Sequence, residues 1–173
     1  QLKASYGSVG NSSGLSPYMA MGLIGTGPLY NGVGGTAVAN PANPDLTWEV
    51  VKSTNLAVNT RMFNRVNLDV ELYNRETEDM LMDIPYSYTT GFSGGWGNVA
   101  SMRNKGVDLT AGVEIIKDFH GLDWSVTANL NYNENEITSL FNGMDEYVLA
   151  NTGLKLQVGK PYGEYFYTRW AGV

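Results

Sequence analysis

Four long segments of this chain alternate apolar and polar side chains at every second residue, and this pattern restricts the fold more than any other feature. The segments span residues 46–59, 66–77, 105–116 and 122–133. A period of two is typical of β-strands, in which successive side chains point to opposite faces of a sheet. Helical periodicity is poor throughout, so the sequence predicts an all-β fold with antiparallel strands.

The two faces differ in chemistry, and the difference repeats from segment to segment. In residues 66–77 one face carries aliphatic side chains and the other carries amides and charged groups. We expect one side of the sheet to present Leu68, Val70, Leu109, Val113, Val126 and Leu130. We expect the opposite side to present Asp69, Glu71, Asp108, Asn129 and Asn131.

The connections between the segments alternate in length. Residues 9–44, 78–104 and 134–163 form long connections rich in Gly, Asn and Pro, whereas 61–65 and 118–121 form tight turns. Strands of this length exceed the globular mode of about 5–6 residues. They match membrane-spanning strands, which need about 9–11 residues and have short turns on one side and long loops on the other. The pattern predicts part of a large transmembrane β-barrel with long extracellular loops and short periplasmic turns.

Shorter strands are expected near both ends of the chain, at residues 2–8 and 165–172. The first segment begins inside a strand-like pattern, and the last stops without a closing element. We therefore expect an internal piece of a longer protein.

A soluble β-sandwich, such as a carbohydrate-binding module, is the alternative interpretation. Its strands would show the same alternation with the apolar face turned inward. Lys52 adds a difficulty for the barrel, because it falls on the apolar face of residues 46–59, where a cation at the bilayer midplane costs about 2–4 kcal/mol. Either Lys52 lies among lipid head groups or a bulge shifts the phase of the strand.

Composition disfavours several other functions. A formal net charge of −6 argues against nucleic-acid binding, which needs clustered Lys and Arg. The absence of cysteine excludes disulfides, thiolate zinc sites and a cysteine nucleophile. The single histidine, His120, lies in a turn signal, and the carboxylate pairs are better explained as solvated groups than as catalytic pairs. The sequence therefore predicts neither an enzyme nor a metal or cofactor site.

Three ordered motifs resemble one family. Asn43-Pro-Asp-Leu-Thr-Trp-Glu49 is similar to the Asn-Pro-x-Leu-x-Trp-Glu signature of SusC/RagA-type TonB-linked outer-membrane proteins. The run from Leu68 to Leu81 is similar to a strand of that family with its following Tyr, basic residue, Thr and acidic residue. Asn98 to Asp108 is similar to its Asn-Lys-Gly-Val-Glu segment, with Ala100 in place of the usual Gly and Asp108 in place of Glu.

This resemblance implies a function and a set of partners. It implies import of oligosaccharides or peptides across the outer membrane of a Gram-negative bacterium, driven by TonB, with a SusD-like surface lipoprotein over the mouth of the barrel. Complete members also carry a signal, a plug and a barrel of about 22 strands. Residues 1–173 would then be part of the barrel domain, and the signal, the plug and the remaining strands would lie outside this sequence.

Aromatic residues in the second long connection are the candidate binding site. Tyr86, Tyr88, Phe92 and Trp96 lie within eleven residues of one another, among glycines that let the backbone adapt. Tyr147 and Tyr162 could join them. Flat aromatic faces provide contact area at low entropic cost, so these residues could stack on sugar rings, contact a peptide or support the lipoprotein.

Overall fold

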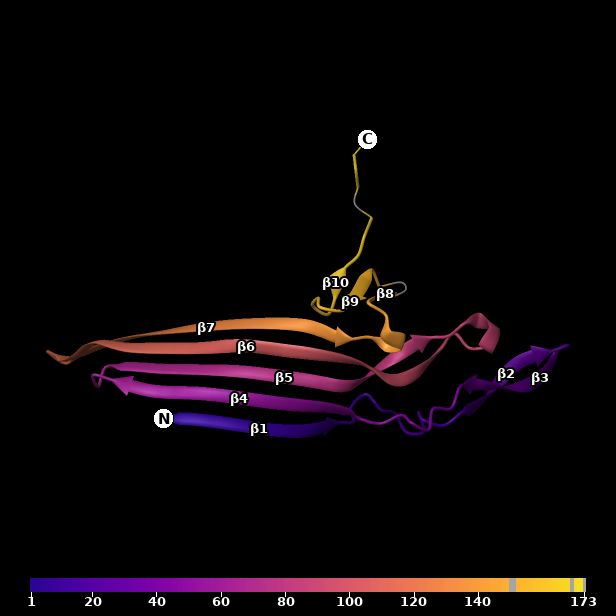
Figure 1. Cartoon of the computed structure of the whole chain (residues 1–173), viewed down its shortest axis with the longest axis horizontal. Coiled ribbons are helices and arrows are strands. Elements are labelled where there is room, and N and C mark those ends of the chain that lie inside the picture. Colours follow the sequence, from indigo (N-terminus) through magenta and orange to yellow (C-terminus); the bar gives the residue numbers. More distant parts are fainter. Residues whose placement is uncertain (150–151, 169, 173) are drawn as a thin grey trace.

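The computed structural model describes residues 1–149, 152–168 and 170–172, and its main element is one antiparallel sheet of five strands (Figure 1). The strand order is β1-β4-β5-β6-β7, so each strand lies beside the next long strand in the sequence. The strands are β1 (Leu2–Asn11), β4 (Glu49–Met62), β5 (Val66–Pro85), β6 (Gly94–Phe119) and β7 (Leu122–Ser139). Within the described residues the sheet stays open and does not close into a barrel.

The register of the strands places like side chains in rows across the sheet. One apolar row joins Leu56, Leu72, Val107 and Tyr132, and the next joins Val58, Val70, Leu109 and Leu130. Between them runs a row that begins at Ala57 and continues through the polar residues Glu71, Asp108 and Asn131. The predicted separation into an apolar face and a polar face is therefore confirmed.

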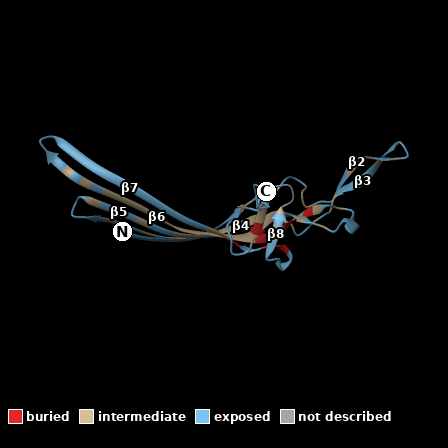
Figure 2. Ribbon diagram, turned by 90° about the horizontal axis from the view of Figure 1, so that it is seen from above, coloured by how far each residue is buried: buried red, intermediate tan, exposed pale blue. Residues whose placement is uncertain are grey.

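Neither face of the sheet is covered near the two tight turns. Leu130 is 64% exposed and Leu72 is 45% exposed, although both belong to the apolar rows. Figure 2 shows that buried residues are confined to the opposite, loop-bearing end of the strands. A soluble sandwich would need a second sheet over the apolar rows, and no second sheet lies there in the part of the chain that the structure describes.

Two of the predicted long connections, 78–104 and 134–163, are wrong in their bounds. β5 and β6 remain paired up to Pro85 and Gly94, so the connection between them is 86–93 rather than 78–104. The sequence hides this extension because two register shifts between Thr77 and Leu81 break the alternation, while the backbone pairing continues. β7 likewise extends to Ser139.

Two of the long connections contain strands of their own. Residues 9–44 hold a hairpin of β2 (Leu23–Tyr30) and β3 (Val33–Asn40), whose turn residues Asn31 and Gly32 both have positive φ, as an Asn-Gly hairpin turn requires. A three-stranded sheet follows β7 and consists of β8 (Glu146–Leu149), β9 (Leu154–Gln157) and β10 (Glu164–Tyr165).

The strand expected at 165–172 is confined to Glu164–Tyr165. Residues 166–168 and 170–172 find no strand partner among the described residues, and residue 169 lies outside them. Helical structure in the described residues is limited to the 3-10 turns Tyr88–Thr90 and Phe141–Gly143. No helix in these ranges is long and apolar enough to cross a membrane.

A small apolar core joins the two sheets at the loop end. It consists of Ala100, Ile137, Leu140 and Leu156, with Met80, Met82, Tyr147 and Leu149 packed against it. Ile137 alternates with Asn135 and Asn133 along β7, so its side chain lies on the polar face. Because Ile137 packs with Leu156 of β9, the small sheet lies on the polar side of the main sheet.

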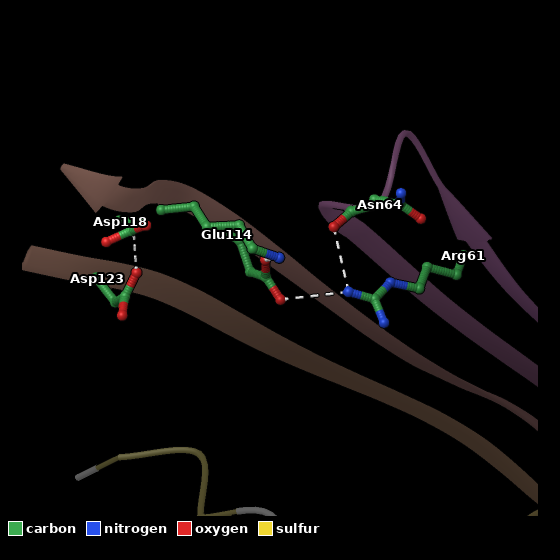
Figure 3. A network of polar contacts seen from close by, with 6 residues as sticks. Arg61, Asn64, Glu114, Asp118 and Asp123 are labelled. Atoms are coloured by element: carbon green, nitrogen blue, oxygen red, sulfur yellow. Dashed lines mark hydrogen bonds and ion pairs between the residues drawn. The ribbon is translucent and has the colours of Figure 1, made fainter.

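Polar contacts at the other end hold the first tight turn to β6 and close the second turn (Figure 3). The guanidinium of Arg61 donates to the backbone oxygen of Asn64 at 3.2 Å and lies 3.5 Å from the carboxylate of Glu114 on β6. The Asp118 N–H donates to the carboxylate of Asp123 at 2.7 Å, which closes the second turn. His120 is an exposed residue of that turn, as predicted.

Candidate functional site

The signature segment 43–49 crosses the loop ends of β5 and β6 and is held there by side chains. The Asn43 amide donates to the backbone oxygen of Trp96 at 2.9 Å. Asn98 binds both backbone groups of Thr47 at 2.8 Å and donates to the backbone oxygen of Asp79 at 2.7 Å. These bonds replace strand pairing, which explains why β4 begins at Glu49 and not at residue 46 as predicted.

Glu49 extends the same clamp to β1 and β5. One carboxylate oxygen accepts from the Leu81 N–H at 3.1 Å, and the other accepts from the Asn11 amide at 3.0 Å. Trp48 packs against Gly10, where an added Cβ would come within 2.9 Å of the indole. The polar residues of the motif therefore hold four strands together at the rim, a role that the sequence pattern alone did not reveal.

The four predicted aromatic residues do not form one cluster. Tyr86 packs against Gly95, where an added Cβ would lie 2.9 Å from the phenol oxygen. Tyr88 is 88% exposed on the 3-10 turn, and Phe92 is half-buried. Of the four, Trp96 lines a hollow at the rim.

Trp96 lies in a groove of about 390 Å³ between the rim of the main sheet and the small sheet. Tyr147 and Tyr162 line this groove with it, as do Leu81, Met82, Asp83 and Leu149. Tyr147 is fixed by an edge-on contact with Phe141 at 4.9 Å between ring centroids. Sequence reasoning missed the four non-aromatic residues, because β5 and β8 meet only through the tertiary fold.

The polar face holds a second, broader hollow of about 570 Å³. Its lining is made of Asn55, Glu71, Tyr73, Arg75, Asn104, Asp108, Asn131 and Asn133. Tyr73 lies over Gly106 of β6, where an added Cβ would collide with the phenol, and its hydroxyl lies 3.0 Å from the amide oxygen of Asn133 on β7. One side chain thus braces three strands and explains why glycine occupies position 106.

The apolar face ends in a belt of ion pairs toward the loops. Lys52 lies two rows beyond Leu56 and pairs with Glu78 at 2.6 Å. Arg103 pairs with Glu136, and Lys105 pairs with Glu134 at 3.4 Å. The register of β4 on both neighbours is regular around Lys52, so no bulge shifts its phase. Lys52 therefore belongs to a polar level beyond the apolar rows.

An apolar face without a core, a polar face opposite it and a charged belt above are typical of a barrel wall in a membrane. Residues 1–170 match the family model described as TonB dependent receptor-like, beta-barrel. The chain belongs to this family. It is therefore part of a β-barrel of the outer membrane of a Gram-negative bacterium.

Relatives of known name agree with the family. TonB-dependent receptor P26 of Formosa agariphila is 34% identical over 92% of this chain, and TonB-dependent receptor SusC of Bacteroides thetaiotaomicron is 28% identical over 68%. A solved structure of the RagAB peptide importer in the open-open state superposes with a TM-score of 0.82 at 38% identity over 92% of the chain. The chain spans only 17%, 12% and 18% of these three proteins.

Proposed function

We propose that this chain forms part of the wall of a TonB-dependent transporter that imports oligosaccharides or peptides across the outer membrane. One observation carries the proposal: a single sheet of long strands presents apolar rows on one face and a polar wall on the other. The apolar rows run from Leu122 to Tyr132 on β7, which is eleven residues, and a membrane-crossing strand needs about 9–11. The polar wall then lines an aqueous path.

The loop end is the extracellular side in this proposal, and the two tight turns face the periplasm. A SusD-like lipoprotein would cover the mouth, and TonB would act through parts of the protein outside this sequence. SusC and the RagAB peptide importer among the similar proteins support this class of transporter. Tyr86, Tyr88, Phe92 and Trp96 remain candidates for contact with the substrate or the lipoprotein.

The proposal assigns transport rather than catalysis. The carboxylates of Glu78, Glu134 and Glu136 are engaged with Lys52, Lys105 and Arg103, so they are poorly placed to act as free acids or bases.

Uptake by whole cells tests the proposal directly. Cells that express the complete transporter and its neighbouring lipoprotein should take up a nutrient oligosaccharide or peptide only when TonB is present. Deletion of the transporter gene should abolish growth on that nutrient at limiting concentration. Equal uptake with and without TonB would contradict the proposal.

Cysteine labelling tests the orientation. In a cysteine-free background, an impermeant maleimide should label Thr89→Cys on intact cells, because Thr89 is exposed on the loop between β5 and β6. His120→Cys should be labelled only after the cells are opened. The reverse pattern would invert the proposed orientation.

A further inference from the structure

We propose that the groove lined by Trp96, Tyr147 and Tyr162 binds a peptide, with a cationic group between Asp83 and the indole and a neighbouring apolar side chain against the tyrosines. The inference rests on the proposed function of nutrient import and names the ligand class for one site of it. The juxtaposition of one carboxylate with three aromatic rings carries the argument.

Asp83 and Trp96 face the same side of the sheet at adjacent positions. They are register partners on β5 and β6, and directly opposite residues have Cβ atoms about 4.5–5.5 Å apart. A cation held between them would gain both a charge-assisted hydrogen bond and a cation–π contact. Among the described residues no Lys or Arg forms an ion pair with Asp83, so the carboxylate is available to a ligand.

The rest of the groove is apolar and firmly held. Met82, Tyr147 and Leu149 pack against the small core, so the floor is preformed. Trp96 is 45% exposed and Tyr162 is 53% exposed, which leaves their rings accessible. The Tyr162 N–H is fixed by the Asn135 side chain at 2.7 Å. A preformed pocket loses less entropy on binding than one that must order itself.

The same lining provides fewer hydrogen-bond partners for a sugar than the polar wall does. A sugar ring carries hydroxyls on most of its carbons, and each buried hydroxyl without a partner costs free energy. The groove offers one carboxylate, two phenol hydroxyls and one indole N–H as side-chain partners, whereas the polar wall offers amides, carboxylates, a phenol hydroxyl and a guanidinium. Peptide side chains match the groove better.

The position of the groove agrees with this use. The small sheet lies on the polar side of the main sheet, and Asn135, which binds the Tyr162 N–H, belongs to the polar face. A ligand that enters from the loop end toward the polar wall would therefore pass the groove first.

Calorimetry on the complete transporter in detergent, without its lipoprotein, tests the inference. The probes are a pentapeptide with adjacent lysine and phenylalanine, its lysine-to-glutamine and phenylalanine-to-serine analogues, and maltoheptaose. Trp96→Ala and Tyr162→Ala should each raise the Kd for the first peptide about tenfold, while Trp96→Phe keeps most of the affinity. Asp83→Asn should raise the Kd for the lysine peptide about fivefold or more and leave that for the glutamine analogue unchanged. Tyr18→Ala is the matched control, because Tyr18 is an exposed aromatic residue of the connection after β1 and does not line the groove.

Other outcomes would overturn the inference while leaving transport intact. These are an unchanged peptide Kd in all groove variants that still support TonB-dependent uptake, a loss of maltoheptaose binding in Trp96→Ala, or a loss of lipoprotein association with peptide affinity unchanged. Heat-modifiable mobility in gels confirms that each variant barrel is assembled. Absence of TonB-dependent uptake in the unmodified transporter would instead refute the proposed function.

Discussion

The half of the sheet near the two tight turns (the turn half) and the half near the long connections (the loop half) are stabilised in different ways. In the apolar rows near the turns the register of β4, β5, β6 and β7 is regular, and β6 shifts against β7 only beyond Glu114. Both faces are open there, and no core is present among the described residues. At the loop end the register shifts, Asp79 takes a positive φ, and side chains such as Asn98 and Glu49 bind backbone groups directly. A strand between lipid and water needs only alternating side chains, whereas a rim without regular pairing needs partners for individual backbone groups.

The largest effect is expected from a charged substitution in the apolar rows of the turn half. Ala111→Arg places a cation in the middle of the apolar rows and should lower the free energy of unfolding in vesicles by about 2–4 kcal/mol. Thr110→Arg, one residue away on the polar face, should cost much less. Urea titration of the complete barrel in lipid vesicles measures both, and equal losses would refute the assignment of the faces.

A substitution that disturbs the packing of Tyr73 over Gly106 should give the next largest effect. Gly106→Ala forces Tyr73 or the backbone of Tyr132 to move, at a cost of about 1–3 kcal/mol. Gly112→Ala is the matched control on the same strand, because its added Cβ would lie 3.5 Å from Thr127, an ordinary contact. The same urea titration should separate the two variants, and equal stability would show that Tyr73 moves freely.

Loss of the hydrogen bonds that hold segment 43–49 at the rim should destabilise only the loop end of the sheet. Asn98→Ala removes three hydrogen bonds that hold residue 47 and Asp79, and should destabilise the rim by about 1–3 kcal/mol without affecting barrel assembly. Hydrogen exchange should quicken at residues 43–49 and remain slow near the turns. Asn129→Ala on the polar wall serves as the control, and global loss of protection would contradict a local role.

The smallest effect concerns the belt of ion pairs. Lys52→Met should leave stability nearly unchanged, because half-exposed ion pairs contribute little. If Lys52 lay within the hydrocarbon, the same substitution would clearly stabilise the barrel. Urea titration in vesicles therefore determines the level of Lys52 in the membrane.

The sequence predicted the turn half well and the loop half poorly, for a physical reason. A period of two reports which face a side chain occupies, so residues 66–77 and 122–133 could be assigned correctly. Beyond Thr77 the bulges and the glycines at 94, 95 and 97 erase that period, although backbone pairing continues. The height of Lys52 relative to the apolar rows follows from the register of the neighbouring strands. The alternation of side chains along β4 alone carries no information about that register.

The candidate site shows the same limit. Trp96 was predicted from the density of aromatic residues in its loop, but nothing local distinguishes it from Tyr88. Its partners Tyr147 and Tyr162 are brought to it by the small core around Ile137 and Leu156. Asp83 was missed because its position opposite Trp96 follows from register alone.

The two tight turns end at different heights along the strands (Figure 1). Val66, next to the first turn, pairs with Val113, whereas β6 continues six residues further to Phe119, about 20 Å along an extended strand. Such stagger between neighbouring hairpins accompanies strands that are inclined to the barrel axis. A force directed along the axis then loads many interstrand hydrogen bonds at once in shear and does not peel them apart singly. The stagger of the hairpins thus makes this wall resistant to a pull along the axis.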